Sequence, residues 1–475
     1  MINKDISSRY SPLIISGIIG LIILLVSFEY GMFWDNVLFA SKMGNHLYEN
    51  GIFNWTIPDS FDPGHPPFLA FLLAVAWKLF GHSLWVSHLT MLPFTIGAVY
   101  QLYRFVNYYV KNKTISYLGL LLILADPTLM TSFVLVNPET IIIFLFFLTI
   151  NGILYQKNNW KFIGLFFLSI ITFRSMMLFA GLFLFNILND SIIQKKKIKE
   201  LINFRILGFY SLAALPGIIF VTWRLLSKGW LQTHPESPWV SLWKFASIKE
   251  FFYNVIILVW RYLDFGRIFI FLFLIITFWS LRKRIFENKF IQQLLLLAIC
   301  SVLLVIITVL LSTNAFGHRY FIVSYICVIL VGFLTLLELK KYKNTLFVLL
   351  LIGLISGNLW IYPEKISQGW DATLAHTPYH QLRKDAIKFL DVKEIDFKQV
   401  GTFFPNYNTI DEIDFTGDYR SFADFNKINK YVFYSNVYNL SDEEYRLLEK
   451  NYQEIKRFER FGVFVSILEN NMFSN

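Results

Sequence analysis

Apolar runs long enough to cross a lipid bilayer recur along most of this chain, from Pro12 to about Tyr362. A helix needs about 20 apolar residues to cross the roughly 30 Å of hydrocarbon in a membrane. Of the 475 residues, 55% are hydrophobic and only 16% are charged, which is more apolar surface than one soluble core buries. The sequence therefore predicts a polytopic α-helical membrane protein.

Polar residues take over beyond the last apolar run. This change predicts two domains, a membrane domain at 1–362 and a small soluble α/β domain at 363–475. Ser441 and Glu444 have the spacing of a capping box at the start of a helix. The strands expected in the second domain are Val400–Phe404, Lys430–Tyr434 and Gly462–Leu468, and its expected helices are Tyr379–Leu390 and Asp442–Tyr452.

The formal net charge of +10 does not indicate a nucleic-acid partner, because Lys and Arg gather in short clusters between the apolar runs. Such clusters are typical of cytoplasmic loops. The first run, Pro12–Phe28, follows Lys4 and Arg9 but lacks a small-residue cleavage site, so we expect a retained first helix. Cys300 and Cys327 lie inside apolar runs, which favours neither a disulfide framework nor a thiolate metal site.

The basic clusters also predict the topology. If all of them are cytoplasmic, neighbouring clusters must be separated by an even number of crossings. Applied along the chain, this rule gives about eleven membrane helices, a cytoplasmic N-terminus and an extracytoplasmic C-terminal domain. The clusters are Lys4/Arg9, Arg104/Lys111/Lys113, Lys157/Lys161, Lys195–Lys197/Lys199, Arg282–Arg284/Lys289 and Lys340/Lys341/Lys343.

The segment FDPGHPPFLAFLLAVAWKLFG contains one apolar run that breaks this parity if it crosses the membrane. The run has roughly 13 residues, about 20 Å as a helix, which is shorter than a span needs. It also carries Trp77 and Lys78, which suit the headgroup level. We therefore expect Pro66–Phe80 to form an interfacial helix on the outer face. The alternative is that it crosses and a later helix is miscounted.

This topology brings the unusual polar residues to the outer side of the membrane. Ionisable residues at membrane depth are costly and usually face a cavity, so their convergence on one level predicts a site shared by several helices. These residues are Asp35, Asp62, His65, Glu139, Arg174, His318 and Arg319.

The first outer loop, with WDNVLFASKMGNHLYENGIFNW followed by GHPPFLAFLLAVAWKLFGHSLWVSHL, resembles the GT-C fold glycosyltransferases. The likeness is to the protein O-mannosyltransferase and aminoarabinose-transferase branch, in which an acidic loop motif precedes two juxtamembrane helices, a Pro-Pro pair and an LFG-type turn. It is strongest over Phe28–Leu92, weaker through Asn137–Phe144 and slight in the tail. The resemblance implies a GT-C fold.

The same resemblance implies roles for individual residues. Asp35 matches the loop carboxylate that acts as catalytic base, although Asn36 stands where a second acidic residue often follows. Glu139 matches the acidic position of the second outer loop, usually Asp, and we group it with Asp35 as catalytic. Arg319 resembles a late basic residue near the donor phosphate, and Arg174 is a candidate for similar work. Asp62, His65 and His318 complete the expected substrate-binding set.

The function implied is transfer of a sugar from a polyprenyl-phosphate donor to a lipid, glycan or protein acceptor, with inversion, on the outer side of a bacterial inner membrane. No cofactor is expected. The chemistry needs a base for the acceptor proton and a positive field for the departing phosphate, and one carboxylate with one Arg provides both. Arg suits the phosphate better than Lys because its planar fork contacts two oxygens.

Other interpretations of these residues stay open. Asp35 can cap a helix, Glu139 can complement a helix N-terminus, and Arg174 can snorkel or pair with an acidic neighbour. His65 and His318 have no metal-ligand spacing, so no metal is expected. Three tryptophans of the loop after Leu226 are candidates for stacking on a sugar or guiding a lipid: Trp230, Trp239 and Trp243.

Two other functions compete with transfer. A transporter or flippase for a lipid-linked or anionic substrate usually has repeated halves and Gly- or Pro-broken spans at matching positions, and the sequence shows neither. A receptor or scaffold whose tail binds a partner leaves Asp35 without a function.

Overall fold

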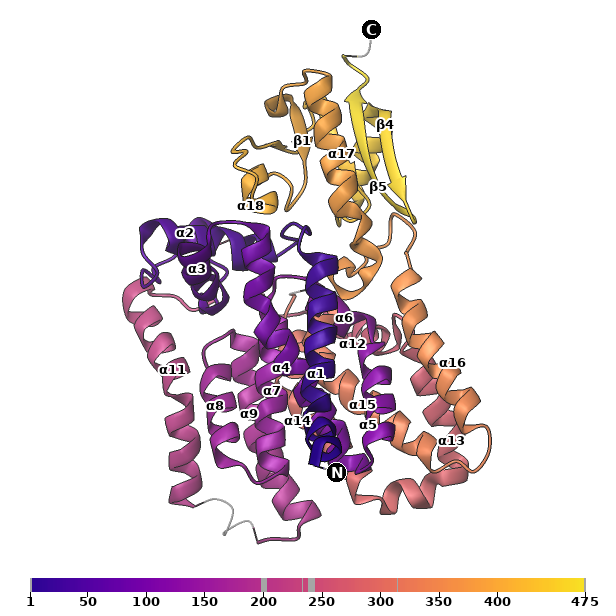
Figure 1. Cartoon of the computed structure of the whole chain (residues 1–475). Coiled ribbons are helices and arrows are strands. Elements are labelled where there is room, and N and C mark those ends of the chain that lie inside the picture. Colours follow the sequence, from indigo (N-terminus) through magenta and orange to yellow (C-terminus); the bar gives the residue numbers. More distant parts are fainter. Residues whose placement is uncertain (1, 198–202, 233, 238–243, 314, 474–475) are drawn as a thin grey trace.

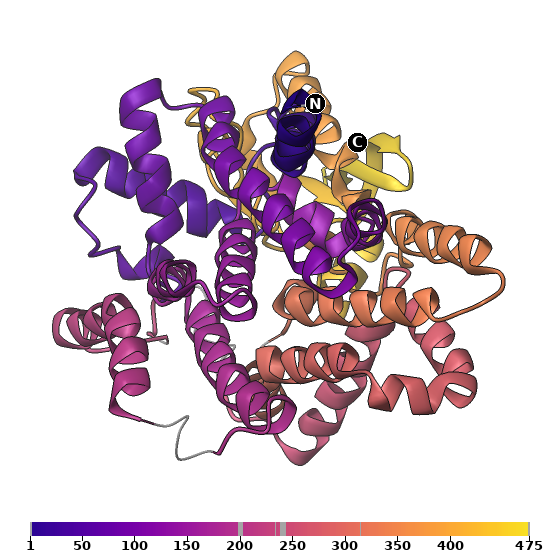
Figure 2. The ribbon, with the colours of Figure 1, turned by 60° about the horizontal axis from the view of Figure 1, so that its bottom comes forward.

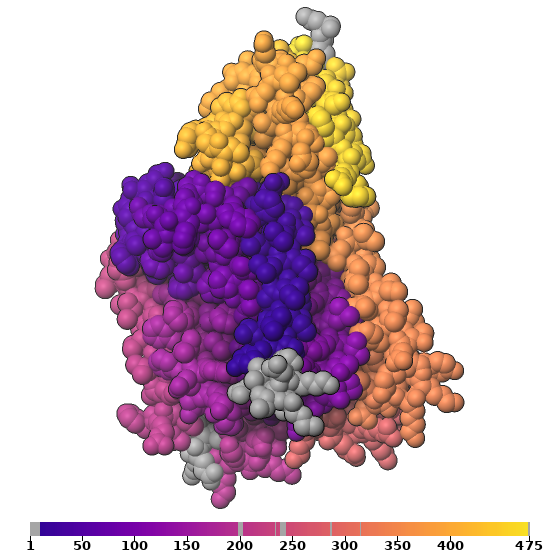
Figure 3. All heavy atoms as spheres, viewed as in Figure 1, coloured from indigo at the N-terminus to yellow at the C-terminus, as the bar shows by residue number. Residues whose placement is uncertain are grey.

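The computed structural model describes residues 2–197, 203–232, 234–237, 244–313 and 315–473. Long helices form a bundle, and a small domain with a β-sheet lies at one end of it (Figure 1). The N-terminus of α1 (Ile2–Ser27) lies at the end of the bundle opposite to this domain. The space-filling view shows the same stack, with the C-terminal domain narrower than the bundle (Figure 3).

The predicted apolar runs form the helices of the bundle. Their bounds are α1 Ile2–Ser27, α4 Leu84–Val110, α5 Lys113–Leu124, α6 Pro127–Val134, α7 Pro138–Leu154, α8 Asn158–Leu168, α9 Phe173–Leu188, α11 Phe204–Lys228, α12 Ile248–Leu263, α13 Ile268–Glu287, α14 Lys289–Leu311, α15 Ile322–Leu337 and α16 Lys343–Ser356.

Five helices of the described ranges are long and apolar enough to cross a membrane, or seven if each of two bent pairs forms one span. The chain is thus a polytopic membrane protein. Several other helices, including α7 and α16, are apolar but shorter than a full span. The count of about eleven crossings therefore stays a prediction.

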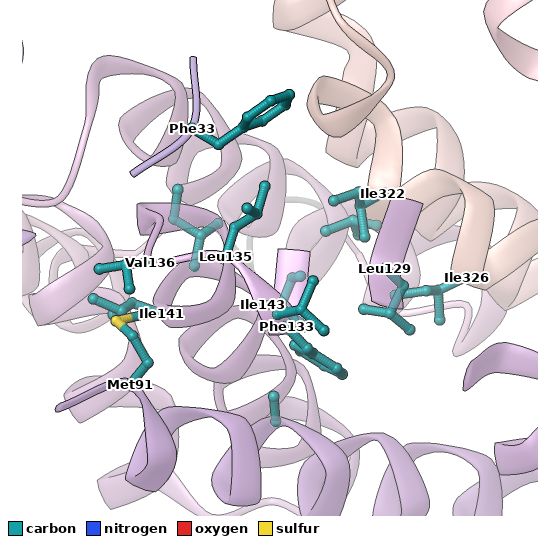
Figure 4. Close-up of a cluster of buried hydrophobic side chains, with 14 of the residues drawn as sticks. Phe33, Met91, Leu129, Phe133, Leu135, Val136, Ile141, Ile143, Ile322 and Ile326 are labelled. Carbon is teal, nitrogen blue, oxygen red and sulfur yellow. The ribbon is translucent and has the colours of Figure 1, made fainter. Parts of the chain in front are cut away.

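Helix α7 forms the centre of the bundle. It is apolar on all sides and buried along nearly its whole length, as expected of a helix surrounded by others. It packs between α4 and α8. Figure 4 shows part of this core, where side chains of α4, α6, α7 and α15 interdigitate. Helix α11 lies on one side of the bundle, and α13 and α16 lie on the other (Figure 2).

The short apolar run after the first loop forms α3 (Phe68–Phe80), preceded by α2 (Met43–Asn50). Both helices lie at the end of the bundle that carries the C-terminal domain (Figure 1). Trp77 of α3 is buried close to Gly44 of α2, where a Cβ atom would meet the indole at 2.7 Å. Lys78 is exposed, and its ammonium lies 5.0 Å from the ring centre of Tyr48. The run therefore forms a separate short helix, and its interfacial position on the outer face stays a prediction.

Two helix pairs bend sharply, although the sequence shows no pair of Gly- or Pro-broken spans at matching positions. The chain turns by 80° between α5 and α6 and by 87° between α12 and α13. Pro127 begins α6, and the Asp126 side chain accepts hydrogen bonds from the first N–H groups of that helix. Gly266, with φ of 81°, allows the second bend.

A buried ion pair joins the two bends. Arg267 donates from Nε to Oδ2 of Asp126 at 2.7 Å and from Nη2 to Oδ1 at 3.1 Å. Both side chains are at most 2% exposed, and the guanidinium lies over the Tyr325 ring at 3.9 Å. A bidentate pair with such burial fixes the two bends relative to each other.

The C-terminal domain contains a five-stranded mixed sheet of order β2-β1-β3-β5-β4. Strand β1 is parallel to β2 and β3, and β5 is antiparallel to β3 and β4. Helix α17 packs against β4 and β5. The bounds are β1 Val400–Thr402, β2 Ala423–Asp424, β3 Tyr431–Ser435, β4 Tyr452–Arg460, β5 Val463–Asn470, α17 Pro378–Val392, α18 Ile410–Asp414 and α19 Asp442–Asn451.

All three predicted strands and both predicted helices of this domain are present, and Ser441 and Glu444 form the predicted capping box. The sequence reasoning missed α18, β2 and β4. The sequence of β4, YQEIKRFER, is mostly charged and exposed, because this strand forms an edge of the sheet.

We expect Arg267→Met to destabilise the protein by about 3–5 kcal/mol, because the substitution leaves the Asp126 carboxylate buried without its partner. The double variant Asp126→Asn with Arg267→Met should recover much of this loss. Unfolding of the purified protein in detergent measures both. Arg284→Met, which removes a partly exposed ion pair with Glu338, is the control and should have little effect. Equal stability of wild type and Arg267→Met would contradict this role.

Candidate active site

A cavity of about 280 Å³ lies where the helix bundle meets the segment between α16 and α17. Its wall combines the turn after α1, the loop before α3, the first turns of α7 and α9, the ends of α12 and α14, the 3₁₀ turn η4 (His318–Phe321) and the 3₁₀ turn η6 (Trp370–Ala372). Many separate segments therefore meet at one point, as expected of a pocket in a helical bundle.

Five charged residues of this wall form one connected group, which we name the charged cluster: Asp35, Glu139, Arg174, Arg319 and Asp371. Arg319 donates from Nη2 to Asp35, and its Nη1 lies 2.9 Å from Oδ2 of Asp371. Its Nε lies 3.8 Å from Oε1 of Glu139, which in turn accepts a hydrogen bond from Arg174. Four of the five were predicted from the sequence, and the structure brings them together.

Local structure decides between the alternatives for these residues. The π-helical turn η1 (Val37–Lys42) follows Asp35, but no capping hydrogen bond comes from the Asp35 side chain among the described residues, where its partner is Arg319. Glu139 lies in the first turn of α7, which Asn137 caps, so it complements the helix N-terminus as one alternative expected and also pairs with Arg174. Arg174 lies in the first turn of α9 and pairs with an acidic neighbour, as one alternative expected. In the described part of the chain, Asp35 therefore acts as an ion-pair partner of Arg319 and not as a helix cap.

Burial raises the pKa of Asp35 above its ordinary value, while the nearby positive charge of Arg319 opposes this rise and the negative charge of Asp371 adds to it. A carboxyl with a raised pKa holds a proton more readily. This property suits a group that removes a proton from a weakly acidic hydroxyl.

His65 also lines the cavity, stacked on Phe39 with ring centres 5.3 Å apart. The backbone N–H of Phe173 donates to its Nδ1 at 3.4 Å, so the ring proton is assigned to Nε2. Burial, together with the positive charges of Arg174, Arg224 and Arg319, lowers the pKa of His65 to about 3. At neutral pH this imidazole is an uncharged hydrogen-bond donor.

Two predicted substrate-binding residues lie outside the cavity wall. Asp62 is fully buried and accepts from Arg224 of α11 at 3.0 Å and from the N–H of Gly64 at 2.8 Å, which holds the loop before α3. His318 is also buried, with its Nε2 2.8 Å from Oδ2 of Asp264. Both positions support neighbours that do line the cavity.

None of the described tryptophans of the loop after α11 lines the cavity. Trp230 is buried, and the guanidinium carbon of Arg224 lies 4.2 Å from the centre of the Trp230 ring. Trp230 does not line the cavity. Trp239 and Trp243 lie outside the described residues. Instead, Trp34, Tyr320 and Trp370 provide aromatic surface to the cavity.

Sequence reasoning missed two charged residues of the wall. Asp371 comes from a polar segment with no motif around it. Arg261 lies in the last turn of α12 and donates from Nε to the carbonyl of Phe316 at 3.3 Å. Within the described ranges it makes no ion pair with a carboxylate. An Arg inside the apolar stretch NVIILVWRYL was the one available indication.

Buried polar atoms without a partner also face this region. In the described part of the chain, Oε2 of Glu139, Nη1 of Arg174 and Nε1 of Trp34 have no hydrogen-bond partner. Unsatisfied buried groups are uncommon in native proteins, and those at the wall of a cavity are free to contact a bound molecule. All three residues line the cavity.

One group of three possible metal ligands occurs in the described residues, with ligand atoms within 4.8 Å of one another: Asp59, His234 and Glu236. None of the three lines the cavity, and neither His65 nor His318 belongs to the group. Lys228 already holds the Asp59 carboxylate at 2.5 Å.

The fold and the cavity define a class of protein, a multi-pass helical membrane protein with a charged pocket under a small C-terminal α/β region. Within that class, the chain has a GT-C-like glycosyltransferase fold. It is similar over 96% of its length, and over 98% of the other chain, to the crystal structure of ArnT from Cupriavidus metallidurans bound to undecaprenyl phosphate, with a TM-score of 0.53 and 11% identity.

The apo structure of the same ArnT matches 97% of the chain and 98% of its own length, with a TM-score of 0.51 and 10% identity. Neither a protein-family model nor a curated protein matches the sequence. At such low identity the likeness establishes the fold.

We expect His65 to make stability depend on pH. An unfolded His ionises near its ordinary pKa of 6.5 and folded His65 near 3, so between these values the unfolded chain binds an extra proton and stability falls as pH falls. From pH 7 to 5 the wild type should lose up to about 2 kcal/mol more than His65→Gln. Thermal unfolding in detergent at both pH values measures this difference. Identical pH dependence in the two proteins would show that His65 is not held neutral.

Proposed function

We propose that the protein transfers a sugar from a polyprenyl-phosphate donor to an acceptor on the outer side of a bacterial inner membrane, with inversion at the anomeric carbon. The observation that carries this proposal is the direct pairing of Asp35 with Arg319 in the cavity wall. The GT-C-like fold, and the undecaprenyl phosphate in the ArnT complex, support a donor of this type.

The pair provides the two functions that the reaction needs. Asp35 removes the proton of the acceptor hydroxyl as its oxygen attacks the anomeric carbon from the face opposite the phosphate. The bond from that carbon to the phosphate oxygen breaks, and the electron pair leaves with the polyprenyl phosphate. Arg319 lies close enough to stabilise the negative charge that develops there.

Arg261 and His65 complete the proposed donor site. Arg261 lines the cavity, and in the described part of the chain it has no carboxylate to neutralise it, so its guanidinium is available for phosphate oxygens. Neutral His65 adds a hydrogen-bond donor. Glu139 holds Arg174 and has a carboxylate oxygen without a partner, which suits a contact with a sugar hydroxyl.

We propose a topology of about eleven crossings with residues 1–362 as the membrane domain and 363–475 as an extracytoplasmic domain. The N-terminal start of the bundle and the C-terminal domain lie at opposite ends (Figure 1), as an odd number of crossings requires. The cavity then opens on the outer side.

The bent helices bear on the transporter alternative. In transporters, broken helices expose their ends to a substrate near the middle of the membrane. Here the bends at Asp126 and Arg267 face each other, and neither residue lines the cavity. The bends therefore favour a fixed scaffold and not a transport path.

Asp35→Asn should lower the transfer rate by about 10²–10⁴-fold, because the reaction loses its base while the side-chain shape stays the same. The wild-type rate should fall as pH is lowered through the raised pKa of Asp35, since only the ionised carboxylate accepts a proton. Release of polyprenyl phosphate from radiolabelled donors measures both. Glu49→Gln, an exposed position on α2, is the control. Full activity in Asp35→Asn would refute the assignment of the base.

Arg261→Gln should weaken binding of undecaprenyl phosphate by about 10–100-fold, since a charge-assisted hydrogen bond is worth about 1.5–3 kcal/mol. Arg205→Gln, an exposed position in the first turn of α11, provides the matched control. Native mass spectrometry of the purified protein measures the affinity. Unchanged binding in Arg261→Gln would place the phosphate elsewhere.

A further inference from the structure

Carboxylates contact both terminal nitrogens of the Arg319 guanidinium. Nη2 contacts Asp35 and Nη1 lies 2.9 Å from Asp371, whereas Nε, 3.8 Å from Glu139, has no hydrogen-bond partner among the described residues. Two-point binding of a phosphate requires a free edge of the fork. A phosphate that binds Arg319 at two points must therefore replace one of these carboxylates, because either edge of the fork includes a nitrogen that a carboxylate already contacts.

The charges in the cluster lead to the same conclusion. The cavity wall holds three carboxylates and, with Arg261, three guanidinium groups, so its charges balance before the donor binds. The phosphodiester of a polyprenyl-phosphate sugar adds a negative charge, and like charges in a partly desolvated site are screened weakly. Release of one carboxylate from Arg319 relieves this repulsion.

Asp371 is the carboxylate that is free to leave. Glu139 is held by Arg174 at the N-terminus of α7, and Asp35 must stay in the site if it is the base. Within the described ranges, Arg319 is the one ion-pair partner of Asp371. The Asp371 side chain is 16% exposed, against 4% for Glu139.

The backbone around Asp371 is fixed, so the exchange needs only a side-chain rotation. The carbonyl of Ala372 accepts a hydrogen bond from Oγ1 of Thr128 at 3.1 Å. Gln368 is bound on both sides, to the carbonyl of Trp360 at 3.0 Å and to the N–H of Tyr362 at 2.8 Å.

We propose that Asp371 is the counter-anion of Arg319 that the donor's phosphate replaces on binding. This inference rests on the proposed function. Asp371 is a positioning residue: it holds the Arg319 side chain towards Asp35 and gives up its own contact when the lipid phosphate arrives. The segment after α16 thus contributes directly to donor affinity.

The test is binding of undecaprenyl phosphate to the full chain in lipid nanodiscs, by native mass spectrometry, for wild type, Asp371→Asn and Asp371→Ser. Both variants remove the competing charge, so both should bind about tenfold more tightly than wild type. Glu443→Gln removes an exposed carboxylate of the C-terminal domain, on α19, and should bind like wild type. A variant damaged in its fold binds more weakly, so tighter binding cannot arise from misfolding.

Each outcome decides a different point. Unchanged or weaker binding in both Asp371 variants, with normal binding by wild type and Glu443→Gln, overturns the inference and leaves the proposed function intact. Absence of binding by wild type overturns the proposed donor and the inference with it.

Discussion

Nearby anions stabilise a guanidinium at the border between a membrane bundle and a soluble domain, and in this protein Arg319 has three of them. Asp35 follows the first helix, Glu139 begins α7, and Asp371 comes after the last helix of the bundle. One side chain therefore ties together segments that are hundreds of residues apart in the sequence. The cavity exists where these segments meet.

A second layer of buried polar contacts holds this arrangement in place. The turn that carries Arg319 also carries His318, which is fixed by Asp264 at the bend between α12 and α13. The neighbouring Arg267 binds Asp126 at the other bend. Thr128, which accepts from Arg267, donates to the backbone beside Asp371. The two bends thus position the cation and one of its anions.

The sequence predicts the parts of the molecule that depend on local pattern. Apolar runs become helices, and the short run containing Lys78 becomes a separate helix at the end of the bundle. The predicted topology places four ionisable residues at the same depth in the membrane: Asp35, Glu139, Arg174 and Arg319. An ionisable residue at that depth requires a partner, so the sequence predicts that the four share one site.

What the sequence does not predict depends on contacts between distant segments. Asp371 lies in a polar stretch where an acidic residue is unremarkable, and only the docking of that stretch onto the bundle brings it to Arg319. Arg261 reaches the cavity because it lies just before the sharp bend at the end of α12, and the hydrophobicity pattern does not reveal that bend. Asp62 and His318 are residue types that often bind substrates. In this fold, however, Asp62 is the buried partner of Arg224 and His318 is the buried partner of Asp264.

The most direct test of the charged cluster as the place of reaction is a cryo-electron microscopy map of the protein with undecaprenyl phosphate. We predict density for the phosphate in the cavity, within hydrogen-bond distance of Arg319 or Arg261, with the Asp35 carboxylate facing it across the space for a sugar. Phosphate density outside the cavity, with the Arg319 contacts unchanged, would contradict the proposed site.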